Sequence, residues 1–239
     1  MNKSSLIISI VALVLAIAAL VCCLFGCGKG DTAAVESALK AKPEMVVDAI
    51  KAYEQNMRER AAEEAKKMIE ENISELNSDA DTPFVGPQDA KVTVVEFFDY
   101  SCGYCRRLFP ELKSVVEANA DVKFVFKPLT FLGEVSVAAA KASLAAAKQG
   151  KFAEVHNALF SSSERLTNEK IRAIAQEKGL DMEKFDADVK SEDISKYLGK
   201  VSNLANKIQV NGVPVLFVNG NILQTLDGKD IQDAINSNK

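Results

Sequence analysis

The chain has 239 residues, of which 48% are apolar and 26% charged, with 29 Lys and Arg against 33 Asp and Glu. This length accommodates one domain with a sizeable appendage or two small domains, and the composition excludes collagen-like and wholly disordered proteins. A net charge of −4 provides no basic surplus, so we expect no nucleic-acid partner. Because His156 is the single histidine, multi-histidine metal sites are excluded, and we expect no metal or other cofactor.

The first 30 residues have the composition of a membrane segment. Twenty residues without a charge, 6–25, follow Lys3, and a helix of that length spans the roughly 30 Å hydrocarbon core of a bilayer. A cleavable secretory signal usually has a shorter apolar core of about 7–15 residues. The sequence Leu24-Phe25-Gly26-Cys27 is similar to a lipoprotein cleavage box, whose processing would lipidate Cys27. We therefore predict a membrane anchor at residues 6–25, with lipidation at Cys27 and simple cleavage as the alternatives.

Residues 31–80 are predicted to form a helical stalk. Helix formers such as Ala, Glu, Lys and Met dominate, and Pro43-Glu44 suits a helix start. From Val46 to Leu76, apolar side chains recur every three to five residues and form one narrow face of a helix about thirty residues long. Such a helix is unstable in water without a packing partner, so we expect a homo-oligomer of two or three chains through the stalk. Packing on the domain that follows and a solvated spacer are the alternatives.

Residues 81–239 are predicted to form a compact α/β domain. The predicted strands cover 91–98, 122–126, 214–218 and 221–226, and the helices that follow the first and last of them cover 103–118 and 229–236. A crossover helix between the first two strands makes them parallel, whereas Asn219-Gly220 predicts a tight hairpin between the last two. Helical stretches at about 135–207 form an insert between the two halves.

Two cysteines, Cys102 and Cys105, are the only ones in this domain. A predicted strand ends just before Cys102 and a helix follows, so its thiolate would be stabilised by the free N–H groups and dipole of a helix N-terminus. A second thiol one helical turn later can resolve a mixed disulfide. The alternatives are a structural disulfide and half of a zinc site, but zinc would need two more ligands and His156 is the only other obvious soft one. The spacing therefore indicates thiol–disulfide exchange.

Two segments are similar to the motifs of DsbA-like thiol–disulfide oxidoreductases of bacterial envelopes. They are VEFFDYSCGYC at 95–105 and NGVPVLFVNG at 211–220. The resemblance covers residues 84–239, and the stalk more loosely resembles the N-terminal helices of the oligomeric, isomerase-like branch. It implies a thioredoxin-like fold with an inserted helical subdomain, preceded by the helical stalk and the membrane segment.

The resemblance also implies roles for individual residues. Cys102 corresponds to the attacking cysteine and Cys105 to the resolving one. Glu96 corresponds to the buried acid beneath the disulfide, where it would accept the proton that Cys105 loses, with Lys127 as its suggested partner. An edge salt bridge is the alternative role for Glu96.

The same resemblance implies a substrate-binding loop. Val213 and Pro214 correspond to a cis-proline loop that lies across the active site and presents a backbone edge to an unfolded peptide. Gly103 and Tyr104 are expected to contact the substrate from between the cysteines. The most oxidising members of the family carry a histidine where Tyr104 stands, so we expect a weaker oxidant here.

The function that the resemblance implies is thiol–disulfide interchange on unfolded or misoxidised exported proteins. The protein would act at the periplasmic face of the inner membrane or as a lipoprotein, and a membrane redox partner would recycle its cysteines. Oxidase and isomerase activities both remain open. The alternative is a non-catalytic membrane-anchored surface or interaction protein with a degenerate thioredoxin-like domain. His156 is expected to be a packed histidine and not a catalyst.

Overall fold

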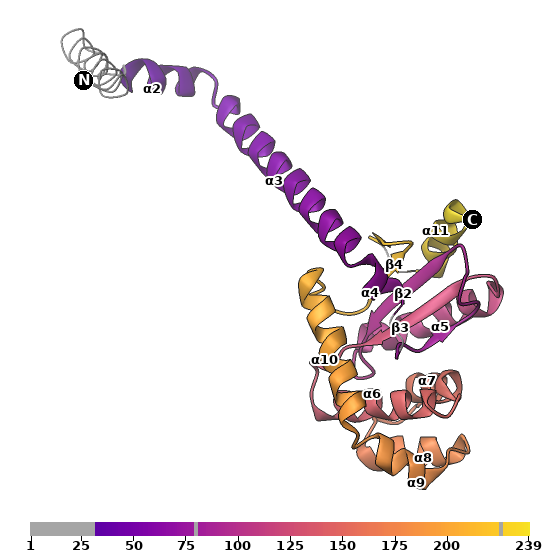
Figure 1. Cartoon of the computed structure of the whole chain (residues 1–239). Helices are drawn as coiled ribbons and strands as arrows, with labels where there is room; N and C mark the ends of the chain where they lie inside the picture. The colour runs from indigo at the N-terminus through magenta and orange to yellow at the C-terminus, as the bar shows by residue number, and fades with distance from the viewer. Residues whose placement is uncertain (1–31, 79–80, 225–226) are drawn as a thin grey trace, which may run out of the picture. The chain divides into compact units, whose positions relative to one another are not determined.

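The computed structural model describes residues 32–78, 81–224 and 227–239 (Figure 1). The predicted membrane anchor at 6–25 and Cys27 lie outside these residues. Across the part that is described, no helix is both long and apolar enough to span a bilayer. The chain divides into two compact units between Ala61 and Ala62.

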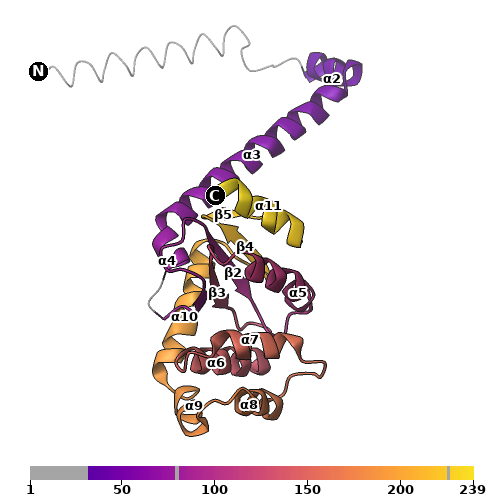
Figure 2. The same cartoon turned by 90° about the vertical axis from the view of Figure 1, so that its right-hand side faces the viewer.

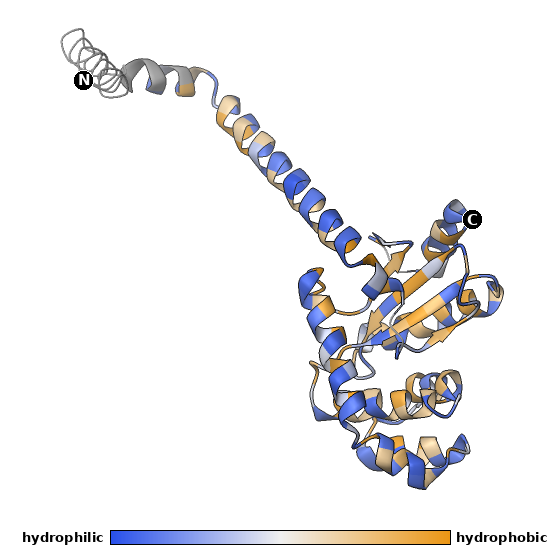
Figure 3. Ribbon diagram, in the orientation of Figure 1, coloured by the Kyte–Doolittle hydropathy of each residue, from blue (hydrophilic) through white to orange (hydrophobic). Residues whose placement is uncertain are grey.

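The first unit contains α2 (Thr32–Ala41) and most of α3 (Glu44–Glu71). Pro43 separates the two helices, and α3 begins directly after it, where the sequence predicts a helix start. The side chains described in this unit are exposed, and Figure 3 shows polar and apolar residues alternating along α3. Ion pairs one turn apart, such as Lys40 with Glu36 at 2.7 Å, support these solvated helices.

The second unit is built on a five-stranded mixed sheet. Its strand order is β1-β3-β2-β4-β5. The strands are β1 (Phe84–Val85), β2 (Thr93–Phe98), β3 (Lys123–Pro128), β4 (Val215–Val218) and β5 (Asn221–Ile222). β2 and β3 are parallel, as predicted, and the other pairs are antiparallel. The central strands are rich in Val and Phe and are buried along their whole length, which suits strands covered on both faces.

The predicted hairpin is confirmed. Asn219 and Gly220 both have positive φ values, +47° and +81°, as a two-residue turn matched to the twist of the strands requires. Gly220 has a second constraint, because a Cβ there would lie 2.7 Å from Cδ1 of Ile73. The return strand β5 ends at Ile222, so the described residues 223–224 of the predicted 221–226 lie outside it.

Helices cover the sheet on both sides (Figures 1 and 2). α5 (Gly103–Ala118) is the crossover between β2 and β3, and it packs beside α11 (Gly228–Asn238) on one face. α4 (Ile73–Asn77) and α10 (Glu192–Lys207) lie on the other face. The insert consists of α6 (Glu134–Ala147), α7 (Phe152–Ser161), α8 (Asn168–Glu177), α9 (Met182–Asp188) and α10, which agrees with the predicted 135–207.

The core of the second unit also includes residues from the end of the predicted stalk. Ile69 on α3 and Leu76 on α4 are buried and belong to the same apolar cluster as the sheet. The compact unit therefore begins at Ala62, well before the predicted boundary between residues 80 and 81. The last turns of α3 are part of the second unit, and only its earlier turns belong to the first unit.

Candidate active site

Cys102 lies at the end of the turn between β2 and α5, directly before the first residue of α5. Its backbone N–H donates to the carbonyl oxygen of Asp99 at 3.0 Å, and α5 begins at the next residue. Cys102 is the N-cap of α5, with extended backbone, and its Sγ accepts a hydrogen bond from the Cys105 backbone N–H at 3.5 Å. The predicted location of Cys102 at a helix N-terminus is confirmed, and the sulfur lies where the helix stabilises negative charge.

A loop distant in sequence lies against the same sulfur. The Cys102 thiol donates to the carbonyl oxygen of Val213 at 3.5 Å, across 111 positions of sequence. The Val213–Pro214 peptide bond is cis, as the resemblance implied, and β4 begins at the following residue. Both residues are half-buried. The loop thus places a backbone carbonyl at the thiol and leaves part of its own edge open to solvent.

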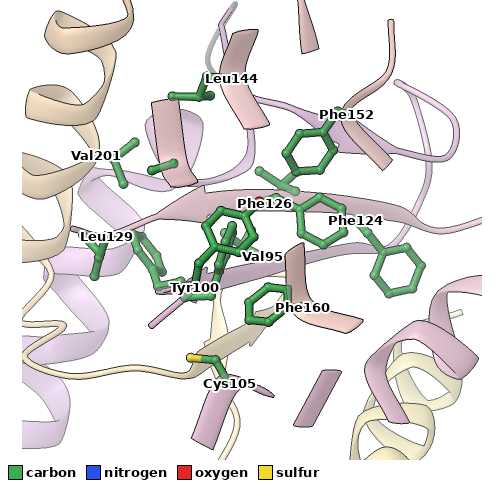
Figure 4. Close-up of a cluster of buried hydrophobic side chains, with 14 of the residues drawn as sticks. Val95, Tyr100, Cys105, Phe124, Phe126, Leu129, Leu144, Phe152, Phe160 and Val201 are labelled. Carbon is green, nitrogen blue, oxygen red and sulfur yellow. The ribbon is translucent and has the colours of Figure 1, made fainter. Parts of the chain in front are cut away.

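The two thiols differ in burial. Cys102 is 7% exposed, whereas Cys105 is 0% exposed and lies in the core, at the edge of the aromatic cluster in Figure 4. Burial raises the pKa of Cys105 above its ordinary value, and the hydrogen bond from the Asp99 backbone offsets part of this rise. The charge of Glu96 raises that pKa further. Cys105 therefore needs a nearby proton acceptor before it can react as a thiolate.

Glu96 is the buried acid of the site. It lies in the middle of β2, opposite Phe126 of β3 and Leu216 of β4, and is 4% exposed. Loss of hydration raises its pKa from 4.5 to about 8, so the protonated form of the carboxyl predominates at neutral pH and the ionised form is the minor one.

Lys127 is not placed to be the partner of Glu96. The register pairs Glu96 with Phe126 and pairs Lys127 with the following residue, Phe97. Directly paired residues share a face and successive residues alternate, so the two side chains project from opposite faces of the sheet. Lys127 instead donates to the hydroxyl of Thr82 at 3.4 Å.

His156 is a packed histidine, as expected. Its ring lies among aromatic rings of the sheet, α5 and α7, with centroids 4.9–5.9 Å away from its own. Its Nδ1 lies 2.9 Å from the hydroxyl of Tyr100, which supplies a hydrogen-bond partner. Burial lowers the pKa of His156 to about 3, so the ring is neutral and supplies no charge to the cysteines.

The residues between and after the cysteines differ in their exposure to solvent. Gly103 is exposed, and Tyr104 is 69% exposed with the guanidinium of Arg107 4.3 Å above its ring. Arg106 instead turns inward and donates to the carbonyl oxygens of Phe160 and Ser162, at 3.0 and 2.8 Å. Gly103 and Tyr104 therefore form the accessible part of the motif.

The sequence analysis missed Asp99. This residue is fully buried, its carboxylate accepts hydrogen bonds from backbone N–H groups, and its backbone contacts both cysteines. The spacing Asp-x-Ser after a strand is typical of a side chain that caps its own turn, and this pattern could have identified Asp99 from the sequence.

Among the residues that the structure describes, no group of three His, Cys, Asp or Glu side chains is placed to hold a metal ion.

The family model of thioredoxin matches residues 78–237, so the chain belongs to the thioredoxin family. The "Probable disulfide bond formation protein D" of Bacillus cereus is 34% identical over 151 residues, which cover 58% of this chain and 70% of that protein. These matches, with the solved structures below, place the chain among the DsbA-like thiol–disulfide oxidoreductases.

Two solved structures share the fold and the class. A thioredoxin-like oxidoreductase from Silicibacter pomeroyi is 35% identical, with a TM-score of 0.65 over 69% of this chain and 95% of that one. The catalytic domain of Proteus mirabilis ScsC is 28% identical, with a TM-score of 0.65 over 72% of this chain and 97% of that one.

A Na⁺/H⁺ antiporter NhaA 3 of Salinispora tropica is 31% identical over 137 residues, and the chain spans only 21% of its length.

Proposed function

We propose that this protein catalyses thiol–disulfide interchange on exported polypeptides, with Cys102 as the attacking residue and Cys105 as the resolving one. The observation that carries the proposal is the placement of Cys102. Its sulfur lies at the N-terminus of α5 and contacts both the Cys105 N–H and the Val213 carbonyl at 3.5 Å. Cys105 lies directly behind it, out of solvent. Cys102 keeps a small exposed fraction, 7% against 0% for Cys105, so a substrate sulfur would meet Cys102 first.

The exchange proceeds through a mixed disulfide. The Cys102 thiolate attacks one sulfur of a substrate disulfide, and the other substrate sulfur leaves as a thiolate and takes up a proton. The Cys105 thiolate then attacks Cys102, which releases the second substrate thiolate and leaves the Cys102–Cys105 disulfide. The substrate gains the two electrons that the enzyme thiols lose. Oxidation of a substrate dithiol follows the same steps in reverse.

Glu96 supplies the proton balance for Cys105. Because the thiol is buried, its proton has no direct path to solvent. In its unprotonated form the Glu96 carboxylate accepts this proton as Cys105 attacks, and in the reverse step it returns the proton to the departing thiolate. A pKa of about 8 keeps both forms of the carboxyl accessible near neutral pH.

The substrate is held next to the loop at Val213 and Pro214. An extended peptide added beside this loop would bring its cysteine to Cys102, with Gly103 and Tyr104 on the solvent side. Such a mode uses mainly backbone contacts and so accepts many unfolded sequences. We infer that this is how unfolded and misoxidised proteins are recognised.

The stalk is proposed to assemble the protein into a homo-oligomer that favours isomerase activity. Apolar side chains lie exposed along the first unit, at Leu39, Met45, Val46, Val47, Ile50, Tyr53 and Met57. Pairing these faces would remove apolar surface from water and set several Cys102 sites around a common space. A bulky recycling oxidase would then reach the thiols less easily, so they would stay reduced and reshuffle wrong disulfides.

The oligomer can be tested apart from the chemistry. Light scattering on residues 31–239 should report two or three chains, whereas residues 62–239, which form the second compact unit, should be monomeric. The shortened protein should also be the better oxidase. A monomer in both cases would contradict the stalk proposal and leave the exchange chemistry untouched.

Localisation is proposed from the N-terminal segment. An anchor at residues 6–25, or lipidation at Cys27, would hold the second unit at the periplasmic face of the inner membrane, where a membrane redox partner would recycle the cysteines. The degenerate interaction protein is disfavoured because both cysteines are present and correctly spaced at the helix N-terminus. Insulin reduction by the purified protein, with Cys102→Ser as the control, decides between these functions.

A further inference from the structure

Asp99 is a buried carboxyl residue that the exchange chemistry does not use. It follows β2 directly and is fully buried, although removing a carboxylate from water is costly unless its oxygens are hydrogen-bonded. Both oxygens have such partners. Oδ1 accepts the backbone N–H of Ser101 at 2.8 Å, and Oδ2 accepts the backbone N–H of Leu132 at 3.4 Å.

The two donors belong to different parts of the site. Ser101 directly precedes Cys102 in the turn that leads into α5, whereas Leu132 lies in the loop between β3 and α6. In that loop Phe131 and Leu132 are exposed, so side-chain packing holds them only weakly. The carboxylate therefore bridges the turn that carries the proposed attacking cysteine and a loop whose Phe131 and Leu132 side chains are exposed.

The backbone of Asp99 contacts the cysteines themselves. Its carbonyl oxygen accepts the Cys102 N–H at 3.0 Å, and its amide hydrogen-bonds the Cys105 thiol. These two groups belong to the peptide units on either side of the Asp99 Cα, so a change in the Asp99 backbone angles would alter both contacts. The side chain extends from the same Cα and accepts the N–H groups of Ser101 and Leu132, so its two hydrogen bonds restrict those backbone angles.

We propose that Asp99 is a positioning residue for thiol–disulfide exchange, whose carboxylate holds the Ser101–Cys102 turn and the Phe131–Leu132 loop in the geometry that reaction at Cys102 requires. The inference rests on the proposed role of Cys102. A purely structural role would predict lower stability with unchanged chemistry in the folded molecules. A positioning role predicts slower exchange and a displaced thiol–disulfide equilibrium in molecules that remain folded.

Two substitutions separate the two hydrogen bonds. Asp99→Asn keeps an oxygen for the Ser101 N–H but places an amide donor against the Leu132 N–H, and Asp99→Ala removes both acceptors. Asp181→Ala is the matched control. Its carboxylate also accepts two backbone N–H groups, from Glu183 and Lys184 at the start of α9, in the insert and away from the cysteines in sequence.

The measurements are the rate constant for exchange with a disulfide-containing peptide, the equilibrium constant with glutathione, and the melting temperature, all on the full chain. We expect Asp99→Ala to slow exchange about tenfold or more and to shift the glutathione equilibrium at least about threefold, with Asp99→Asn intermediate. Asp181→Ala should lower the melting temperature and leave both other values unchanged. Where Asp99→Ala fails to fold, the Asp99→Asn protein supplies the result.

One outcome would overturn the inference: Asp99 variants with a lowered melting temperature but wild-type exchange and equilibrium constants, measured well below unfolding. A different result would reject the proposed function itself. In that case the wild-type protein would show no exchange that depends on Cys102, and the Asp99 variants would have nothing to alter.

Discussion

Replacing Glu96 by glutamine should remove a pH-dependent loss of stability. In the unfolded chain this carboxyl ionises near pH 4.5, whereas in the folded protein burial holds its pKa at about 8. Between these two values the folded state binds a proton that the unfolded state has lost, so the free energy of unfolding falls as the pH rises. The contribution is fully present below pH 4.5 and is lost as the pH passes through about 8. Glutamine has nearly the same shape and does not titrate.

The magnitude follows from the interval between the two pKa values. An interval of about 3.5 pH units, at about 1.4 kcal/mol for each unit, corresponds to about 5 kcal/mol at pH 9. The net stability of a domain is about 5–15 kcal/mol, so the effect is large enough to measure directly. We therefore expect the stability of Glu96→Gln relative to wild type to increase by several kcal/mol from pH 5 to pH 9.

Urea unfolding of the reduced proteins at pH 5, 7 and 9 measures this difference. Glu177→Gln is the control, because Glu177 is an exposed carboxyl at the end of α8, and its pH profile should follow the wild type. Parallel profiles for Glu96→Gln and wild type would refute the reasoning, since they would mean that Glu96 does not titrate with a raised pKa in the folded protein. Exchange by the variant should also slow at the Cys105 step, seen as longer-lived mixed disulfides.

Three further predictions concern the same unit. His156→Gln keeps a hydrogen-bond partner for Tyr100 but cannot titrate. Because burial lowers the pKa of His156 from 6.5 to about 3, the wild type should lose stability as the pH falls through this window, and the variant should lose less. Urea unfolding at pH 4 and 7 measures the difference. Iodoacetamide should label Cys102 before Cys105 in the reduced protein, and Cys105→Ser should accumulate mixed disulfides on Cys102; faster labelling of Cys105 would reverse the assigned roles. Arg106→Met should cost about 1–3 kcal/mol through its two lost hydrogen bonds to carbonyls at the end of α7, and an unchanged melting temperature would contradict this.

Local features of the site followed from the sequence because they depend on neighbouring residues. The strand before Cys102 and the helix after it are set by side-chain type and periodicity, and together they place the sulfur at a helix N-terminus. The hairpin at Asn219-Gly220 was predictable for the same reason, since these residues accept the positive φ values that the turn needs. The helical insert was equally evident from its composition.

Other features depended on which distant segments pair. The two-residue strand β1 carries no periodic pattern of its own and exists because β3 offers it an edge. The suggested pairing of Glu96 with Lys127 was wrong, because the alternation of side chains along paired strands sends them to opposite faces. Likewise, the end of the predicted stalk belongs to the second unit, because Ile69 and Leu76 pack in the apolar core of that unit.

The chemistry of the site combines the two levels. The sequence by itself determined the spacing of the proposed redox pair, since two cysteines one helical turn apart at the start of a helix need no distant partner to define it. Only the tertiary structure determined what surrounds the cysteines. It brings the Val213 carbonyl oxygen to Cys102, buries Glu96, and forms the hydrogen bond from the Leu132 N–H to the Asp99 carboxylate. Spacing along a helix is a property of the local chain, whereas burial and contacts across a sheet arise only when segments far apart in sequence exclude water together.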